Sequence, residues 1–284
     1  MEHVGTDLET PVRLNIGLEA MGIHEGVSLY VHQSSDIVSE CIRKFASWEL
    51  GESAFVLENV SSGDIVIDLG ANIGYYTSIF GKLVGPTGVV YAFEPNDDNF
   101  HLLNRNIRLN NLGNVRAMKA IVGENPGVEM LFEHDESNAG AHMAVGVGGD
   151  SFNKRTIHPR IKLDDLMPVG IDRVDFIKID TQGSEPLIFR GGQNLIKDNA
   201  RRLKMVVEYT PSWIRDFYNM HPSDFYRQIQ SIGFDGFFID PRDNMVKPVD
   251  DIEELTNTVM ACDGISWPAR VSFVDLVFKP KSAR

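Results

Sequence analysis

Four short apolar runs along the chain each finish at or beside an acidic residue. The acids are Asp68, Glu94, Asp180 and Glu208, and the residues before them are mostly Val, Ile and Phe. Short runs of branched and aromatic residues bounded by turn signals are typical of buried strands. In an open parallel sheet the carboxyl ends of the strands share one edge, and ligands bind there. The pattern therefore predicts a site at which these four carboxylates converge.

Helical spacing alternates with the predicted strands. After the strand that ends near Asp68, apolar side chains recur on one helical face from Ile73 to Val84. The other predicted elements are helices within residues 36–55 and strands at residues 115–122, 128–132, 234–239 and 271–278. This order predicts an α/β fold with a doubly wound, Rossmann-like sheet. We expect residues 1–62 to form an N-terminal segment and helical cover, and residues 63–284 to form the main domain.

The turn from the first of these strands into its helix predicts a cofactor cradle. It contains Asp68, Gly70, Asn72 and Gly74. The two glycines permit a tight turn and the close approach of a ligand, and the first amides of the helix face that ligand. The dinucleotide motif G-x-G-x-x-G is absent, because Asn72 occupies its second glycine position. Asp68 favours a positively charged cofactor, such as S-adenosylmethionine with its ammonium and sulfonium, over a pyrophosphate.

The second strand ends at Glu94, which is followed by Pro95 and Asn96. In a βαβ cofactor fold, an acid at this position accepts hydrogen bonds from the ribose hydroxyls. Asn96 has a side chain suited to cap the next helix. Glu94 could instead only complement the dipole of that helix, but this simpler role leaves its spacing from Asp68 unexplained.

Residues 133–160 form a long polar and glycine-rich stretch that includes Asn138, His142 and His158. Long loops in compact domains are usually functional or disordered. We interpret this one as the substrate side, and we expect the acceptor to enter between it and the helices around Trp48. His142 is the candidate for direct participation, because histidine titrates near neutral pH.

Charge and cysteine content restrict the partners. The chain has 40 acidic and 27 basic residues and a net charge of −13, which disfavours nucleic acid because binding to its phosphates depends on Lys and Arg. Cys41 and Cys262 are the only cysteines, so neither a disulfide framework nor a thiolate zinc site is expected. The sequence has no run of eighteen apolar residues. We expect a cytoplasmic protein without a membrane span, and a homodimer is left open.

At these residues the chain resembles the FkbM family of class I S-adenosylmethionine-dependent methyltransferases. The resemblance rests on four blocks, Asp68–Thr77, Phe93–Pro95, Leu163–Leu166 and Ile177–Glu185, and Val206–Glu208 fits the following strand. It implies a seven-stranded sheet with an antiparallel C-terminal strand. It also implies methylation of a hydroxyl on a sugar, lipid-linked or natural-product substrate. One position departs from the family pattern, because Thr181-Gln182-Gly183 stands where Val-Glu-Gly is usual.

The resemblance also implies roles for individual residues. The turn from Gly70 to Gly74 holds the methionine part of S-adenosylmethionine, with Asp68 near its ammonium and Asn72 lending its amide. Glu94 accepts the ribose hydroxyls. Asn96, Ile121 and Val122 flank the adenine.

Asp180 and Glu208 end strands that are expected to be neighbours, so their carboxylates can converge over the transferred methyl group. One interpretation makes them a general base and its orienting partner, with one pKa raised by the nearby like charge. Another makes them ligands of a divalent cation, with Glu185 as a further candidate. A third gives Asp180 a purely structural role. Of these three interpretations we expect the first, in which Asp180 and Glu208 act as general base and orienting partner, and we expect no metal site.

Three functions remain at this point. The first is O-methyl transfer to a small-molecule hydroxyl, and the second is a nicotinamide-dependent oxidoreductase, which shares the fold and the ribose-binding acid. The third is a non-catalytic module that binds S-adenosylmethionine. The broken glycine motif and Asp68 favour the first over the second. An adenine-type N-methyltransferase is disfavoured, because its Asn/Asp-Pro-Pro-aromatic signature is replaced by Asp180-Thr181-Gln182-Gly183.

Overall fold

The fold is described from a computed structural model, which covers residues 10–34, 36–133, 144, 154–262 and 273–281. Its centre is an eight-stranded sheet in the order β12-β11-β13-β10-β9-β3-β4-β5. The five strands from β10 to β5 are parallel, and β13 (Val274–Pro280) runs antiparallel to both of its neighbours. The predicted α/β fold with an antiparallel C-terminal strand is therefore confirmed.

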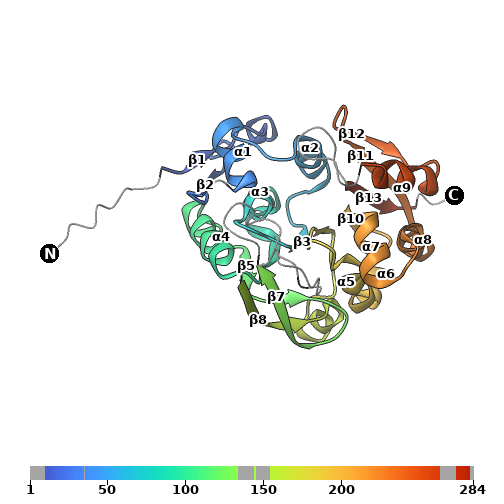
Figure 1. Cartoon of the computed structure of the whole chain (residues 1–284). Helices are drawn as coiled ribbons and strands as arrows, with labels where there is room; N and C mark the ends of the chain where they lie inside the picture. The colour runs from blue at the N-terminus through green and yellow to red at the C-terminus, as the bar shows by residue number, and fades with distance from the viewer. Residues whose placement is uncertain (1–9, 35, 134–143, 145–153, 263–272, 282–284) are drawn as a thin grey trace.

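The elements follow one another as the alternating pattern predicts, and Figure 1 shows their arrangement. The strands of the large sheet are β3 (Ile65–Leu69), β4 (Val89–Phe93), β5 (Val115–Met118), β9 (Phe176–Ile179), β10 (Lys204–Tyr209), β11 (Phe234–Asp240), β12 (Met245–Pro248) and β13. The helices are α1 (Ile37–Phe45), α2 (Leu50–Asn59), α3 (Tyr75–Val84), α4 (Asp97–Leu109), α5 (Glu185–Gly191), α6 (Gln193–Asn199), α7 (Pro211–Tyr218), α8 (Pro222–Gly233) and α9 (Ile252–Met260), with 3-10 turns at η1 (Leu18–Met21), η2 (Gly85–Thr87) and η4 (Leu163–Val169).

The large sheet has one strand more than the predicted seven. The additional strand, β12, pairs antiparallel with β11 at the edge of the sheet. The chain reverses between them at Asp240–Asn244, where Asn244 adopts a positive φ of 59°. Because the residues of this turn are mostly polar, the sequence pattern does not predict the short strand β12.

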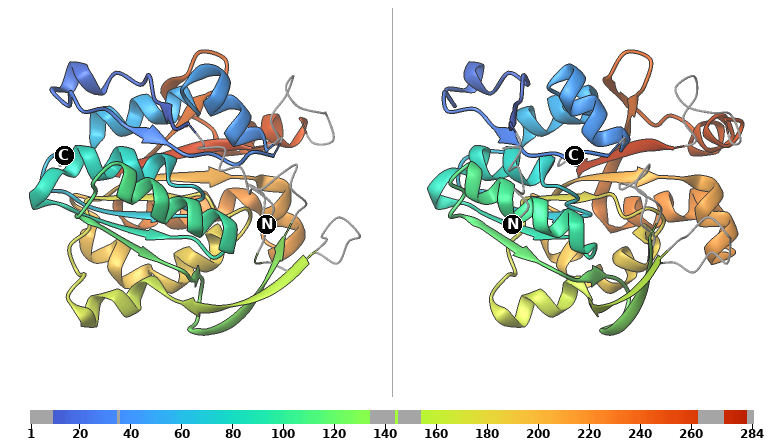
Figure 2. Two further views of the ribbon diagram at one scale, coloured as in Figure 1. Left: turned by 90° about the vertical axis from the view of Figure 1, so that its left-hand side faces the viewer. Right: turned by 60° about the vertical axis from the view of Figure 1, so that its left-hand side comes forward.

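Helices cover both faces of the sheet (Figure 2). Their side chains belong to two apolar cores. One core joins the N-terminal segment and α1 to α4 to the sheet, and includes Leu29, Ile42, Val56 and Phe80. The opposite core contains side chains of α5 to α9, such as Ile188, Ile214 and Phe225. Residues before 62 thus pack into the same core as α3 and α4, and the division into two parts remains a prediction.

A second, three-stranded sheet lies beside the large one in the order β6-β8-β7. The prediction of a single strand at residues 115–122 is wrong, because the chain leaves the large sheet after Met118. Ile121 and Val122 form β6 (Ile121–Val122), which pairs with Arg160 and Ile161 of β8 (Lys154–Ile161). Because of this break, β6 lies near the carboxyl ends of β3, β4 and β9.

The prediction of a loop throughout residues 133–160 is also wrong in part. Lys154 to Arg160 belong to β8, which pairs antiparallel with β7 (Gly127–Glu133). Pro159 and the neighbouring charged residues mask this strand in the sequence. His158 is buried and shares a hydrogen bond with the Thr156 hydroxyl (2.7 Å), and so it supports the strand rather than facing a substrate. The remaining residues of the stretch, apart from Ala144, lie outside the described ranges.

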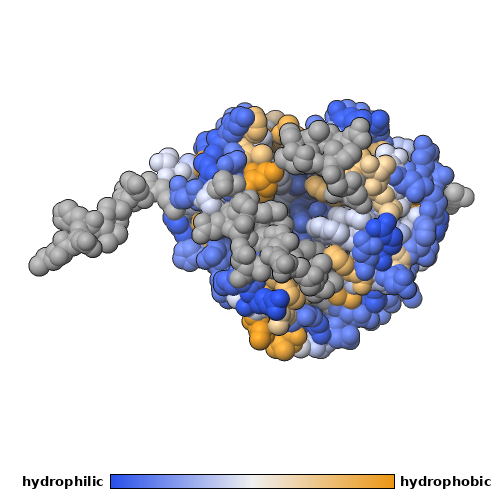
Figure 3. All heavy atoms as spheres, in the orientation of Figure 1, coloured by the Kyte–Doolittle hydropathy of each residue, from blue (hydrophilic) through white to orange (hydrophobic). Residues whose placement is uncertain are grey.

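Apolar side chains are exposed on the small sheet. Val128 and Ile157 are each 71 % exposed, and Met130 is 37 % exposed. In Figure 3 an apolar patch lies low on the molecule, where Figure 1 places β7 and β8. This patch does not test whether the protein forms a homodimer. Among the described residues, no helix is long and apolar enough to cross a membrane.

Candidate functional site

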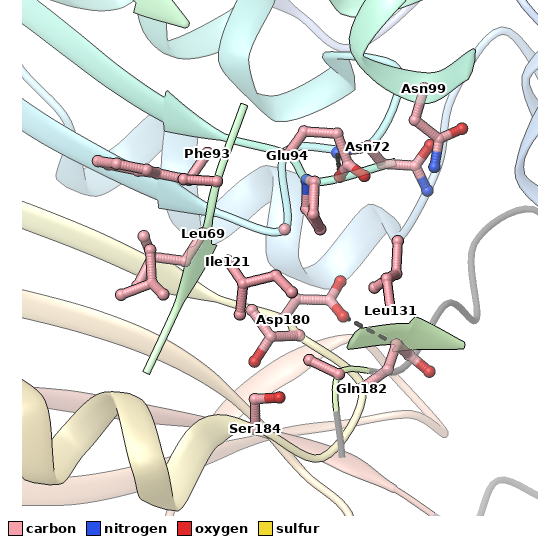
Figure 4. A pocket seen from close by; sticks show the side chains of 16 residues that line it. Leu69, Asn72, Phe93, Glu94, Asn99, Ile121, Leu131, Asp180, Gln182 and Ser184 are labelled. Atoms are coloured by element: carbon pink, nitrogen blue, oxygen red, sulfur yellow. Dashed lines mark hydrogen bonds between the residues drawn. The ribbon is translucent and has the colours of Figure 1, made fainter. Parts of the chain in front are cut away.

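A cavity lies at the carboxyl ends of β3, β4 and β9, where the sequence predicts a site. Figure 4 shows Glu94 and Asn72 on one side of it and Asp180, Gln182 and Ser184 on the other. The residues that line it are Leu69, Gly70, Asn72, Phe93, Glu94, Pro95, Asn99, Ala120, Ile121, Val122, Leu131, Ala144, Asp180, Thr181, Gln182 and Ser184. Six of the predicted site residues, Gly70, Asn72, Glu94, Ile121, Val122 and Asp180, are thus brought together.

The glycine turn brings two strand ends close together. Gly70 has a φ of 80°, and a Cβ at this position would lie 1.7 Å from the carbonyl oxygen of Asp180. Gly74, the residue before α3, has a φ of 91°, and a Cβ there would lie 2.7 Å from Leu103 Cδ1. Glycine is therefore required at 70 by both conformation and space. Gly74 shapes the turn but does not line the cavity.

Glu94 is held in place by backbone amides from both sides. Its Oε2 accepts a hydrogen bond from Asn72 N (2.8 Å), and its Oε1 accepts one from Asn96 N (2.9 Å). The side chain is 5 % exposed, and burial raises the pKa of Glu94 to about 7 against the opposing effect of these hydrogen bonds. Each carboxylate oxygen can accept more than one hydrogen bond, which suits Glu94 to accept ribose hydroxyls from the cavity that it lines.

Asn96 stands behind Glu94 and does not line the cavity. Its side-chain oxygen accepts hydrogen bonds from Asp98 N and Asn99 N, so it caps α4 as predicted. Its side-chain amide donates to Glu133 (2.9 Å). Asn96 therefore helps to position Glu94, and its predicted place beside the adenine stays a prediction.

Asp68 is buried on the opposite face of β3 from Leu69. Its Oδ2 accepts a hydrogen bond from the Thr77 hydroxyl (2.5 Å), while its Oδ1 is buried without a hydrogen-bond partner among the described residues. Burial raises the pKa of Asp68 above its usual range. A buried acceptor without a partner is destabilising, and a ligand ammonium would satisfy it. The prediction that Asp68 lies near the ammonium is compatible with this atom, although Asp68 does not line the cavity.

The apolar side of the cavity is supplied by Ile121 and Val122 together with Phe93, Ala120 and Leu131. Such a wall suits an adenine ring. The fit of S-adenosylmethionine thus rests on two features of the cavity, the carboxylate of Glu94 and the apolar wall at β6. Asp68 Oδ1 lies outside that lining and is a further buried acceptor without a hydrogen-bond partner among the described residues. The family resemblance implies this position for Ile121 and Val122, but the break after β5 that directs them to the cavity has no signal in the sequence.

Asp180 and Glu208 are linked through Gln182. The amide of Gln182 donates to Asp180 Oδ1 (3.0 Å) and lies 3.2 Å from Glu208 Oε2. Gln182 adopts a φ of 54°, which is uncommon for a residue with a side chain. Burial raises the pKa of Glu208 well above its usual range, and the Asp180 charge adds to the effect. The two acids are therefore connected by a bridging amide. Glu208 does not line the cavity, and the convergence of the two carboxylates over the methyl group stays a prediction.

Lys178 is the charged residue that the sequence reasoning missed. It is 3 % exposed, and its Nζ lies 2.9 Å from Asp180 Oδ2 and 3.8 Å from Glu52 Oε1. Burial alone would lower the pKa of this ammonium, but Asp180 and Glu52 outweigh that effect and raise it well above its usual range. The signal is present in the sequence, because a lysine within the apolar run of β9 is unusual unless it is paired.

Two further predictions concern histidine and metal. His142 lies outside the described residues, and its predicted participation remains a prediction. Glu185 is engaged by Thr181 N (2.9 Å) and Gly183 N (3.2 Å) at the start of α5, so it stabilises that turn. Within the described ranges, no group of three or more His, Cys, Asp or Glu is arranged to hold a metal ion.

The sheet order, the glycine turn and the acid after β4 define a class I methyltransferase domain. The family model described as the methyltransferase FkbM domain matches residues 68–235. The chain therefore belongs to the FkbM methyltransferase family and is an S-adenosylmethionine-dependent methyltransferase. The resemblance that the sequence shows is confirmed.

The chain is also similar to individual proteins and solved structures. Methyltransferase sdnD of Sordaria araneosa is 23 % identical over 192 residues, which cover 58 % of this chain and 73 % of that protein. A crystal structure of methyltransferase FkbM from Methylobacillus flagellatus KT is 16 % identical, with a TM-score of 0.45, over 92 % of this chain and 58 % of that one. A Streptococcus mutans protein described as a methyltransferase, solved in complex with SAH (S-adenosylhomocysteine), is 10 % identical, with a TM-score of 0.45, over 82 % and 98 % of the two chains.

Replacing Glu94 with Ala is expected to weaken the binding of SAH about 10- to 100-fold, because hydrogen bonds to a charged group are lost. Isothermal titration calorimetry measures the effect. Glu254, an exposed residue of α9, provides the control variant Glu254→Ala, which should bind as the parent does. Unchanged affinity in Glu94→Ala would remove Glu94 from the ribose site.

The raised pKa of Glu94 also predicts a pH dependence. The carboxylate form accepts hydroxyl donors best, so SAH affinity should rise severalfold from pH 6 to pH 8, across the pKa of about 7. The rise should be smaller in Glu94→Ala. In the free protein the folded state binds this proton more tightly than the unfolded state, so the stability contributed by Glu94 is lost as the pH rises from about 4.5 to about 7.

Proposed function

We propose that the protein transfers the methyl group of S-adenosylmethionine to a hydroxyl of a small molecule, with Asp180 as the general base. The observation that carries the proposal is the position of Asp180. Its carboxylate lines the cofactor cavity and is 30 % exposed, while Lys178 and Gln182 hold its two oxygens. A carboxylate fixed in this way and open to the cavity is suited to accept a proton from a hydroxyl.

Different residues of the chain have different roles in the proposed reaction. When bound, S-adenosylmethionine supplies a methyl group on a positively charged sulfur, which leaves as a neutral thioether. Glu94 and the wall at Ile121 hold and orient the donor, and alignment of donor carbon and acceptor oxygen supplies much of the rate. Asp180 accepts the hydroxyl proton as the carbon–oxygen bond forms. Gln182 and the buried Glu208 fix the direction of the Asp180 carboxylate.

The small-molecule acceptor is supported by charge. The net charge of −13 and the acids at this edge of the sheet oppose a polyanionic nucleic acid. The proposed location in the cytoplasm, the proposed homodimer and the proposed participation of His142 are separate from this argument. They are tested by fractionation, by light scattering and by His142→Ala, respectively.

Asp180→Asn is expected to lower kcat about 100-fold or more, because loss of a general base typically removes a factor of this size. The assay measures SAH release with a panel of hydroxylated acceptors. Asp198 is exposed on α6, and Asp198→Asn serves as the matched control. If Asp180→Asn keeps full activity, Asp180 is not the general base, and alignment of the donor carbon with the acceptor oxygen is enough for the transfer.

The same assay separates the two other functions. Tight binding of SAH with no transfer to any acceptor supports the non-catalytic module. Binding of NADH in preference to SAH supports the oxidoreductase. Transfer that stops on chelation and returns with magnesium supports the interpretation of Asp180 and Glu208 as metal ligands.

A further inference from the structure

A second cavity lies beside the cofactor cavity and has no role in the fold or in cofactor binding described above. It has a volume of about 640 Å³ and lies between α1 and α2 on one side and β11 and β13 on the other. Figure 1 places α2 next to β11 and β12, at the top of the molecule. Trp48, around which the acceptor is expected to enter, lines this cavity.

The walls of this second cavity are mainly apolar. They include Phe45, Trp48, Leu50 and Ile239, and both Phe45 and Leu50 are more than half exposed. Large exposed apolar side chains around a cavity are typical of a ligand site. The occupant they suit has an apolar body.

The charged groups among the described lining residues of the second cavity are all acidic. Glu49, Glu52 and Asp275 line it, and the described lining residues include no Lys, Arg or His. Glu52 is 2 % exposed, and its Oε1 is buried without a hydrogen-bond partner among the described residues. Burial raises the pKa of each of these three acids. A buried excess of carboxyl groups is relieved when a cation arrives, because the cation supplies the missing charge and hydrogen bonds.

Lys178 connects the two cavities. Its ammonium contacts Asp180 Oδ2 in the cofactor cavity (2.9 Å) and pairs with Glu52 Oε1 of the second cavity (3.8 Å). Glu52, which lines the second cavity, and Asp180, which lines the cofactor cavity, therefore face the same ammonium. Lys178 is a single cation shared by Asp180 and Glu52, so the three acids that line the second cavity outnumber the positive charge beside them.

We propose that this second cavity holds the methyl acceptor, and that the acceptor is an apolar molecule carrying a positively charged amine. The amine binds against Glu49, Glu52 and Asp275, and the apolar body lies on Trp48 and Leu50. The role of this ligand as methyl acceptor rests on the function proposed above. The charge and the shape of the ligand rest only on the cavity.

The experiment uses three probes of one chain length: octylamine, which is positively charged at pH 7.5, 1-octanol and octanoate. Binding is followed by the emission of Trp48, after Trp213 and Trp267, the other two tryptophans, are replaced with Phe. Octylamine is expected to bind about tenfold more tightly than 1-octanol, because a hydrogen bond to a charged group is the stronger one. Octanoate should bind most weakly. Equal or tighter binding of 1-octanol overturns the proposed charge of the ligand.

Two variants locate the binding. Cys41 lines the second cavity, and Cys262 lines a different one, between β11 and α9. Cys41→Phe fills the proposed site and is expected to weaken octylamine binding at least tenfold, whereas Cys262→Phe makes the same chemical change elsewhere and should leave it unchanged. Glu52→Gln should weaken octylamine about tenfold and leave 1-octanol within about twofold. An unchanged affinity in Cys41→Phe places the amine outside this cavity and overturns the proposal.

SAH titrations of the same samples separate this inference from the proposed function. Octylamine and SAH are expected to bind together, because they occupy adjacent cavities. Competition between them overturns the assignment to separate cavities. Failure to bind SAH in the parent protein would contradict the proposed function alone, while the preference among the three probes would still decide the inference. SAH binding by Glu52→Gln shows that this variant is folded.

Discussion

A Gly70→Ala variant should lose measurable binding of S-adenosylmethionine and about 3–5 kcal/mol of unfolding free energy. Two effects act together. The φ of 80° is unfavourable for a residue with a Cβ, and that Cβ would lie 1.7 Å from the Asp180 carbonyl oxygen. The obstacle is backbone, which cannot rotate away. The ends of β3 and β9 would have to separate, and Asp180 would move with them.

Two other glycines provide a graded control. In Gly74→Ala the new Cβ would meet the end of the Leu103 side chain at 2.7 Å, which can shift, so we expect a loss of about 1–2 kcal/mol from the positive φ of 91°. At Gly113 an added Cβ would meet nothing within 4 Å, and the φ is not positive, so Gly113→Ala should stay within about 0.5 kcal/mol. Urea unfolding and calorimetry with SAH measure both properties. Tight SAH binding by a folded Gly70→Ala protein would show that the cradle lies elsewhere.

The second large effect is expected at Lys178. Lys178→Met should lower the unfolding free energy by about 3–5 kcal/mol, because it removes the buried cation and leaves its acidic partners uncompensated. Those partners are Asp180 at 2.9 Å and Glu52 at 3.8 Å. Methionine is close to lysine in length and apolar, so the change isolates the charge. Urea unfolding at pH 7.5 provides the measurement.

Controls for Lys178→Met are available in the same chain. Lys197 is exposed on α6, and Lys197→Met should change stability by less than about 0.5 kcal/mol. The double variant Lys178→Met, Glu52→Gln should lose less unfolding free energy than the two single variants lose together. The reason is that one of the uncompensated acids is removed with the cation. Strict additivity of the two changes would contradict the pairing of Lys178 with Glu52.

Raised pKa values also predict how stability responds to pH. Burial raises the pKa of Glu208 well above its usual range, and the same holds for Glu52 and Asp275. Each of these acids binds a proton more tightly in the folded than in the unfolded state. The unfolding free energy should therefore fall as the pH rises above about 4.5, the range in which the unfolded chain begins to ionise. A cation bound in the second cavity should reduce this fall.

The sequence alone determined much of the fold and of the cofactor site, because these depend on local patterns. The turn from Asp68 to Gly74 and the acid at Glu94 follow apolar runs whose pairing order is set by alternation of strand and helix. The cap at Asn96 is predicted from its position before α4 and is confirmed by its hydrogen bonds to Asp98 N and Asn99 N. Such signals span a few residues, so a single sequence can carry them.

The tertiary structure decided what depends on contacts between distant residues. The end of β5 at Met118 and the start of β6 at Ile121 are set by partners in two different sheets. The requirement for glycine at 70 comes from the carbonyl oxygen of Asp180, which is far along the chain. Lys178 pairs with Glu52 across the interface of β9 and α2. No local pattern specifies these contacts, because they arise only when the sheet closes and removes the charged groups from water.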